Sequence, residues 1–127
     1  MGHSDRLVIA DGNFPAESMG KDAIVIRMDG HGAAEMMDAI LQVFPLDTYV
    51  EHPVNLMEVM PGDPVETPIW NTYENIVEKH DARGGNAIGQ IERFAFYEEA
   101  KKVYAIIATG ESALYANIML QKGVVTE

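Results

Sequence analysis

The chain has 127 residues, of which 47% are hydrophobic and 23% charged, and these proportions are typical of one globular domain. Its net charge of -11 would repel nucleic-acid phosphates and anionic lipid surfaces, so neither is an expected partner. Cysteine is absent, which excludes disulfides, thiolate metal sites and cysteine nucleophiles. Any chemistry must therefore use histidine, carboxylate, tyrosine, arginine or backbone groups.

The sequence shows neither a membrane span nor a secretory signal. The longest apolar run, residues 103–108, is far shorter than the ~20 residues that a membrane helix needs. The first residues, MGHSD, lack the basic start and apolar stretch of a secretory signal. We therefore expect a soluble, cytoplasmic protein.

Short apolar runs alternate with amphipathic segments along the chain. Strands are predicted at residues 6–10, 23–27, 54–60, 87–94, 103–110 and 117–125. Helices are predicted at residues 33–44, 69–80 and 96–102, where apolar side chains recur every three to four positions. This alternation predicts a single α/β domain, residues 1–127, with a mostly parallel sheet and helices on its faces.

The loops that follow the strands are the places where such sheets bind ligands. The turn TGESALYAN follows the most apolar strand and presents Glu111, Tyr115 and Asn117 together. The tyrosine hydroxyl and the asparagine amide can both donate and accept hydrogen bonds, which suits a neutral polyhydroxyl ligand.

The segment IERFAFYE offers a second set of groups for such a ligand. Arg93 supplies a forked hydrogen-bond donor, and the aromatic residues Phe94, Phe96 and Tyr97 supply flat faces for the apolar side of a sugar. Taken singly, residues of these types are more often packing aromatics or surface charges. On these residues alone, both interpretations stay open.

The sequence gives little support for a metal site, a nucleotide-binding site or a covalent nucleophile. The histidines, His3, His31, His52 and His80, have no partner at the spacings of known metal sites. The loop DGHG lacks the glycine spacing and the lysine of nucleotide-binding motifs, and no serine lies in a nucleophile elbow. We therefore expect no metal and no cofactor.

His3 precedes the first predicted strand, and Asp11 follows the far end of that strand. Five extended residues span roughly 17 Å, so the two side chains meet only if the chain around His3 folds back. One interpretation is a solvated terminus. The other is a histidine that acts as general acid and base, steered by a carboxylate.

Several short segments occur in a fixed order along the chain, and the ordered set is far more specific than any one motif. They are GHSD, DGNFP, SMG, IRMDG, LDTY, IERFAFYE and TGESALYANIMLQKGV. The sequence resembles the L-fucose mutarotase and D-ribose pyranase family from Met1 almost to its C-terminus. Arg93 stands where a histidine is expected in ribose pyranases, which favours the fucose branch, although fucose-branch members often have histidine where Asn13 stands. Family members usually carry a helical segment before GHSD, and we expect that segment to be missing here.

The resemblance implies a roughly Rossmann-like α/β subunit, a ring-shaped homodecamer, and sites where neighbouring subunits meet. It also implies catalysis without metal or organic cofactor. Matched to the family's motifs, His3 would be the proton donor and Asp11 its partner at the sugar. If two subunits share each site, His3 and Asp11 can come from different subunits, and the length of the first strand no longer keeps them apart. The expected sugar-binding residues are Asp11, Arg93, Tyr115, Ala116 and Asn117.

The expected function is therefore that of a mutarotase, an isomerase that interconverts anomers or ring forms of a monosaccharide, with L-fucose as the expected substrate. A non-catalytic sugar-binding or transport-accessory protein is the alternative, and it predicts binding without exchange. A purely structural ring-forming protein is a further alternative, and it predicts no monosaccharide binding.

Overall fold

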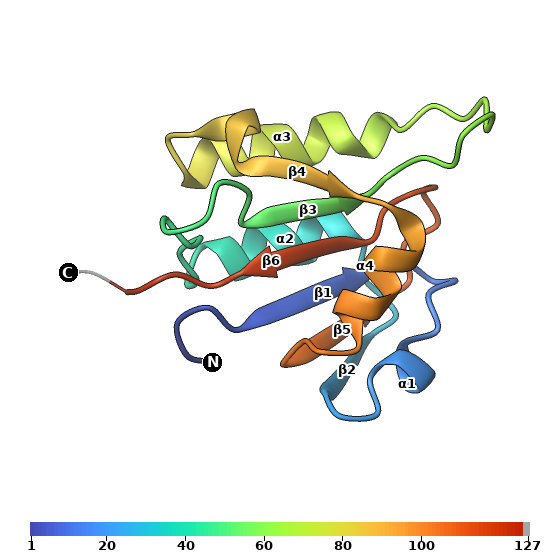
Figure 1. Ribbon diagram of the computed structural model, residues 1–127, viewed down its shortest axis with the longest axis horizontal. Coiled ribbons are helices and arrows are strands. Elements are labelled where there is room, and N and C mark those ends of the chain that lie inside the picture. The colour runs from blue at the N-terminus through green and yellow to red at the C-terminus, as the bar shows by residue number, and fades with distance from the viewer. Residues whose placement is uncertain (126–127) are drawn as a thin grey trace.

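The computed structural model describes residues 1–125, which form a six-stranded sheet with helices on both faces (Figure 1). The strands follow the order β2-β5-β1-β6-β3-β4 across the sheet. Their bounds are β1 Arg6–Ala10, β2 Ile24–Met28, β3 Val54–Met57, β4 Ile88–Ile91, β5 Ala105–Thr109 and β6 Ile118–Gln121. The helices are α1 Ala16–Met19, α2 Ala33–Leu41, α3 Pro68–His80, the 3-10 helix η1 Gly84–Ala87, and α4 Arg93–Ala100.

Strand β6 runs against the rest of the sheet. The pairs β1–β5, β2–β5 and β3–β4 are parallel, whereas β6 is antiparallel to both of its neighbours, β1 and β3. The α/β fold with a mostly parallel sheet is thus confirmed, and β6 makes the sheet mixed. Because of its direction, the start of β6 lies beside the carboxyl ends of β1 and β3, where ligands of parallel sheets bind.

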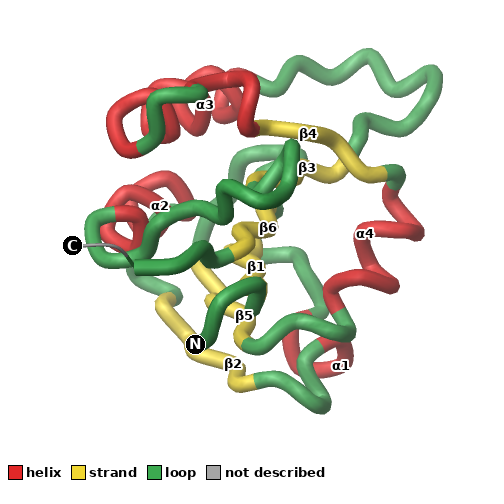
Figure 2. Tube along the Cα trace, turned by 60° about the vertical axis from the view of Figure 1, so that its left-hand side comes forward, coloured by secondary structure: helices red, strands yellow, loops and turns green. Residues whose placement is uncertain are grey.

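Alternate strand residues divide the apolar core between the two faces of the sheet. Leu7 and Ile9 pack with α2 and α3 on one face, and Val8 and Ala10 pack with α1 and α4 on the other. Figure 2 shows the strands lying between these two pairs of helices. No helix formed by residues 1–125 is both long and apolar enough to cross a membrane.

Helix α4 begins earlier than the sequence pattern predicts. The alternation in AIGQIERF predicted a strand through Phe94, but β4 ends at Ile91 and Arg93 is already helical. The carboxylate of Glu92 accepts hydrogen bonds from the backbone amides of Phe94 (3.1 Å) and Ala95 (3.0 Å), and this cap starts the helix. The predicted strand end was therefore wrong, and Arg93 lies on a helix and not on a strand or in a loop.

Other boundaries differ by a few residues. Strand β3 ends at Met57, where its partner β4 also ends, and not at residue 60. Strand β6 ends at Gln121, since Gly123 donates its amide hydrogen to the carbonyl of Pro45 outside the sheet. Helix α2 ends at Leu41, three residues before the predicted end, and the short helix α1 was not predicted.

Candidate functional site

A cavity of about 270 Å³ opens at the carboxyl ends of the parallel strands, beside the start of β6. It is lined by four of the five expected sugar-binding residues: Asp11 after β1, Arg93 after β4, and Tyr115 and Asn117 before β6. The other lining residues are Asn13, Phe14, Met57, Asp63, Tyr97 and Leu114. Ordinary ligand pockets have volumes of about 300–1,000 Å³, so this cavity suits a small ligand.

Asp11 is tied to the turn that enters β6. Its backbone amide donates to Oδ1 of Asn117 (2.8 Å), and its own Oδ1 accepts from the amide of Asn13 (3.0 Å). Burial raises the pKa of the Asp11 carboxyl, and the charge of Glu111 adds to the rise, against backbone hydrogen bonds from Asn13 and Phe14. A carboxyl with a raised pKa takes up and releases a proton more readily near neutral pH.

Tyr115 reaches the cavity from a left-handed backbone conformation, with φ 54°. Its hydroxyl donates to Oδ2 of Asp63 (2.8 Å) and accepts from the backbone amide of Met60 (3.3 Å). Asp63 is not predicted from the sequence, because an acidic residue in a proline-rich loop carries no signal that it faces a ligand. The hydroxyl of Tyr115 thus joins that loop to the turn before β6.

Helix α3 fixes the backbone of the segment before β6. The indole Nε1 of Trp70 donates to the carbonyl of Tyr115 (2.8 Å), and the hydroxyl of Tyr73 donates to the carbonyl of Ala116 (2.5 Å). Ala116 is fully buried and lies outside the cavity lining. The residues on either side of it, Tyr115 and Asn117, line the cavity.

Arg93 and Tyr97 lie one turn apart on α4 and line the cavity together. The guanidinium carbon of Arg93 is 5.7 Å from the centre of the Tyr97 ring, and the ring of Phe14 lies 5.8 Å from that ring. Phe94 and Phe96, which the sequence grouped with Tyr97, do not line the cavity, since one is exposed and the other fully buried. The helical period separates positions 94 and 96 from the face shared by 93 and 97.

Glu111, which the sequence grouped with Tyr115 and Asn117, contacts the start of helix α2 and does not line the cavity. Its carboxylate accepts the backbone amide hydrogen of Ala33 at the start of α2 (3.0 Å), together with amides of its own turn. The residue lies outside the cavity lining. Its contact with α2 holds the turn in place, and its charge acts on the cavity from a distance.

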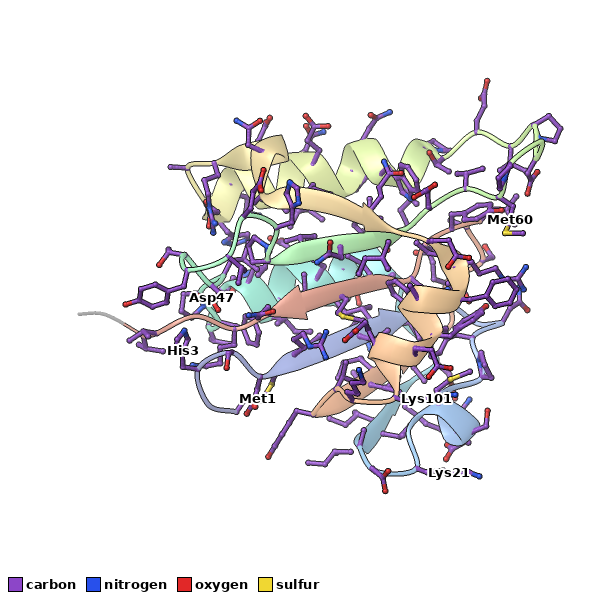
Figure 3. All side chains as sticks on the ribbon, viewed as in Figure 1. Met1, His3, Lys21, Asp47, Met60 and Lys101 are labelled. Carbon is purple, nitrogen blue, oxygen red and sulfur yellow. The ribbon has the colours of Figure 1, made fainter. Side chains whose placement is uncertain are left out.

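His3 lies at the other end of the sheet. Figure 3 shows His3 and Asp47 together at one end and Met60, whose amide contacts the hydroxyl of Tyr115, at the opposite end. The length of β1 separates His3 from Asp11, so one subunit does not bring these two side chains together. The expected pair is therefore absent within residues 1–125 of a single subunit.

Asp47 is the carboxylate that His3 meets instead. Nε2 of His3 is 3.4 Å from Oδ1 of Asp47, and the His3 ring packs edge-on against Tyr49 with ring centroids 5.2 Å apart. Burial would raise the pKa of the Asp47 carboxyl, but hydrogen bonds from the Tyr49 amide, Gln121 and His3 hold it below its usual value. The segment LDTY does not by itself predict a role for Asp47, because the contact of Asp47 with His3 spans 44 positions.

The side chains of residues 1–125 form no group of three or more histidine, aspartate or glutamate residues placed to hold a metal ion. His31 and His80 each meet one carboxylate, that of Glu35 and Asp38 respectively. The expectation of a reaction without metal or cofactor stays a prediction.

The fold is that of a known protein family. The chain belongs to the RbsD / FucU transport protein family, whose model matches residues 1–125. Among solved structures, FucU from Bifidobacterium longum is 67% identical, with a TM-score of 0.98 over 99% of this chain and 88% of that one.

Two further relatives carry names that describe an activity. The human fucose mutarotase is 48% identical over 98% of this chain and 82% of its own length. The fucose mutarotase of Streptococcus pneumoniae, solved in complex with L-fucose, is 45% identical, with a TM-score of 0.92 over 99% of this chain and 87% of its own. Bacillus subtilis RbsD, solved with D-ribose, is 23% identical with a TM-score of 0.74, and shares the fold.

Proposed function

We propose that the protein is a mutarotase, an isomerase that interconverts the anomers of a reducing monosaccharide, with L-fucose as the preferred substrate. The observation that carries the proposal is the gathering of Asp11, Arg93, Tyr115 and Asn117 around one small cavity. These side chains combine a proton-exchanging carboxyl with neutral and cationic donors, which is what a polyhydroxyl substrate requires. The names of the human and pneumococcal relatives support the same activity.

The reaction needs proton transfer at two oxygen atoms of the sugar. A base removes the proton of the anomeric hydroxyl while an acid protonates the ring oxygen, and the ring opens to the aldehyde. Rotation about the bond to the aldehyde carbon and reversal of the proton transfers give the other anomer. Asp11, with its raised pKa, lies in the cavity to exchange one proton with the sugar.

His3 is the second proton-transfer group in this proposal, with Asp47 as the carboxylate that orients it. Since β1 separates His3 from the cavity of its own subunit, His3 acts in the cavity of a neighbouring subunit of a homodecamer. The half-exposed His3 and the exposed Tyr49 beside it form a surface that such a contact would cover. The decamer, the shared sites and the cytoplasmic location are parts of this proposal.

The alternative function is monosaccharide binding without chemistry, and the description of the family as transport proteins favours it. Two-dimensional NMR exchange spectroscopy on the anomeric protons of L-fucose, together with ligand-observed binding, separates the two functions. A mutarotase gives exchange cross-peaks at catalytic protein concentration. Binding with exchange no faster than in protein-free buffer would establish the alternative.

A further inference from the structure

The carboxylate of Asp47 is held on both of its oxygens. Oδ1 accepts the backbone amide hydrogen of Tyr49 (2.9 Å) and faces Nε2 of His3 (3.4 Å). Oδ2 accepts from the side-chain amide of Gln121 (2.9 Å), which lies at the end of β6. Among the described residues, Gln121 is the side chain that fixes the oxygen turned away from His3. The orientation of the carboxylate therefore depends on a residue outside the cavity.

The backbone of the same loop is held separately, by Arg83. Its Nη2 donates to the carbonyl oxygen of Asp47 (3.1 Å), and its Nη1 donates to the carbonyl of Val50 (3.3 Å). The guanidinium charge is paired with Asp81 (2.8 Å). Arg83 thus anchors the loop and leaves the two oxygens of the Asp47 carboxylate to other donors.

Two further charged side chains, one next to Gln121 and one ahead of β1, contact backbone groups. The ammonium of Lys122, next to Gln121, donates to the carbonyl of Gly123 (3.0 Å). Asp5, ahead of β1, accepts the backbone amide hydrogen of Gly2 (2.7 Å). The side chain of Asp47 is 2% exposed, and within residues 1–125 its charge faces only neutral donors and His3 at hydrogen-bonding distance.

We propose that Gln121 is a positioning residue for proton transfer by His3, acting through Asp47. The neutral amide fixes Oδ2 without neutralising the carboxylate, so that Oδ1 stays charged and turned to His3. This inference rests on the proposed function, in which His3 moves a proton. Gln121 itself lies outside the cavity lining of its own subunit.

Removal of the Gln121 side-chain amide should change the pKa of Asp47. A buried carboxylate oxygen loses its donor, and since that hydrogen bond favours the ionised form, the pKa of Asp47 rises. Asp47 then becomes neutral at a higher pH, and His3 loses its charged partner there. Anomer exchange should accordingly fall off on the acid side at a higher pH than in the wild type.

The test compares Gln121→Met, which keeps the length of the side chain and removes the donor, with Gln121→Lys, which restores an N–H donor. Infrared difference titration follows the Asp47 carboxyl, whose band is identified by its loss in Asp47→Asn. NMR exchange on L-fucose gives the pH profile of the rate. Gln90→Met, on the exposed part of β4, is the control for an equivalent change elsewhere on the sheet.

We expect Gln121→Met to move both the Asp47 titration and the acid limb of the rate to higher pH, with exchange about tenfold slower on that limb and nearly unchanged at alkaline pH. Gln121→Lys should bring both back to the wild-type position or below it, and Gln90→Met should change neither. If the Gln121→Met variant is active and its Asp47 titration is unchanged, the role of Gln121 is overturned and the proposed function still stands. Absence of exchange in the wild type would instead overturn the proposed function.

Discussion

The backbone amide of Asp11 donates to the side-chain oxygen of Asn117 at 2.8 Å, across 106 positions of sequence. This hydrogen bond joins the end of β1 to the turn that enters β6, and it aligns the two segments that supply most of the polar lining of the cavity. The antiparallel direction of β6 is what brings Asn117 to this end of the sheet. The site is thus a product of the mixed topology.

Asp11→Asn tests the carboxyl at this junction. The amide oxygen of an asparagine can still accept from the Asn13 amide, but the residue cannot take up a proton, so we expect anomer exchange to fall by at least ~100-fold. NMR exchange on L-fucose measures the rate. A variant as fast as the wild type would remove Asp11 from the chemistry.

The same substitution makes a prediction for stability. The pKa of Asp11 is raised in the folded state from an ordinary value of 3.8, so its ionisation opposes folding once the pH exceeds that value. Asp11→Asn should therefore have a higher Tm than the wild type at pH 7, and the difference should shrink as the pH falls toward 4. Calorimetry at several pH values measures it, and a pH-independent difference would contradict the raised pKa.

The role of His3 can be separated from that of an ordinary exposed histidine. The side chains of His3 and His52 are both 43% exposed, which makes His52 a matched control. We expect His3→Ala to slow exchange by at least ~100-fold, the lower end of the effect of losing an acid–base group, and His52→Ala to leave it within about twofold. Equal rates in the two variants would identify His3 as a terminus without a role in the reaction.

The hydrogen bond between Tyr115 and Asp63 predicts that these residues act as one unit in sugar binding. Tyr115→Phe and Asp63→Ala should each weaken L-fucose binding, and the double variant should be no weaker than the worse single variant, since either change breaks the same contact. Ligand-observed NMR titration gives the three Kd values. Additive losses would show that the two side chains contact the sugar independently.

Shared sites require an assembly larger than one subunit. The mass of the chain is 14.0 kDa, so a decamer corresponds to about ten times that value in light scattering. Tyr49→Asp, at a residue that is 76% exposed in the subunit, should lower the mass and the exchange rate together if the surface around His3 is an interface. A wild type that scatters as a single subunit and still exchanges anomers would contradict shared sites.

Much of the fold follows from local sequence pattern. The apolar runs of β1 and β5 are buried on both faces, so their side chains alone identify them as central strands. The direction of β6 does not follow, because it depends on pairing with β1 and β3, which lie far away in sequence. Arg93 lies on a helix because of one capping carboxylate, Glu92, which an alternating pattern does not reveal.

Some of the site residues can likewise be predicted from the sequence, and others cannot. Asp11 and Asn117 follow or precede strongly apolar strands, and their position marks them as ligand-facing. Asp47 and Gln121 carry no such signal, since their importance comes from one contact between a loop and the end of β6. The separation of His3 from Asp11 follows from the length of β1, which the sequence did give reason to expect.

The central claim is that the cavity converts one sugar anomer into another, and NMR exchange spectroscopy on a panel of L-fucose, D-galactose, L-rhamnose and D-ribose tests it most directly. We expect L-fucose to exchange fastest, because Tyr97, Phe14 and Met57 give the cavity an apolar side for the methyl group of a 6-deoxy sugar. One buried methyl is worth about 1 kcal/mol, so D-galactose should be several-fold slower. Exchange of L-fucose at the protein-free rate would contradict the account, and a wide preference for D-ribose would contradict the substrate assignment that rests on Arg93.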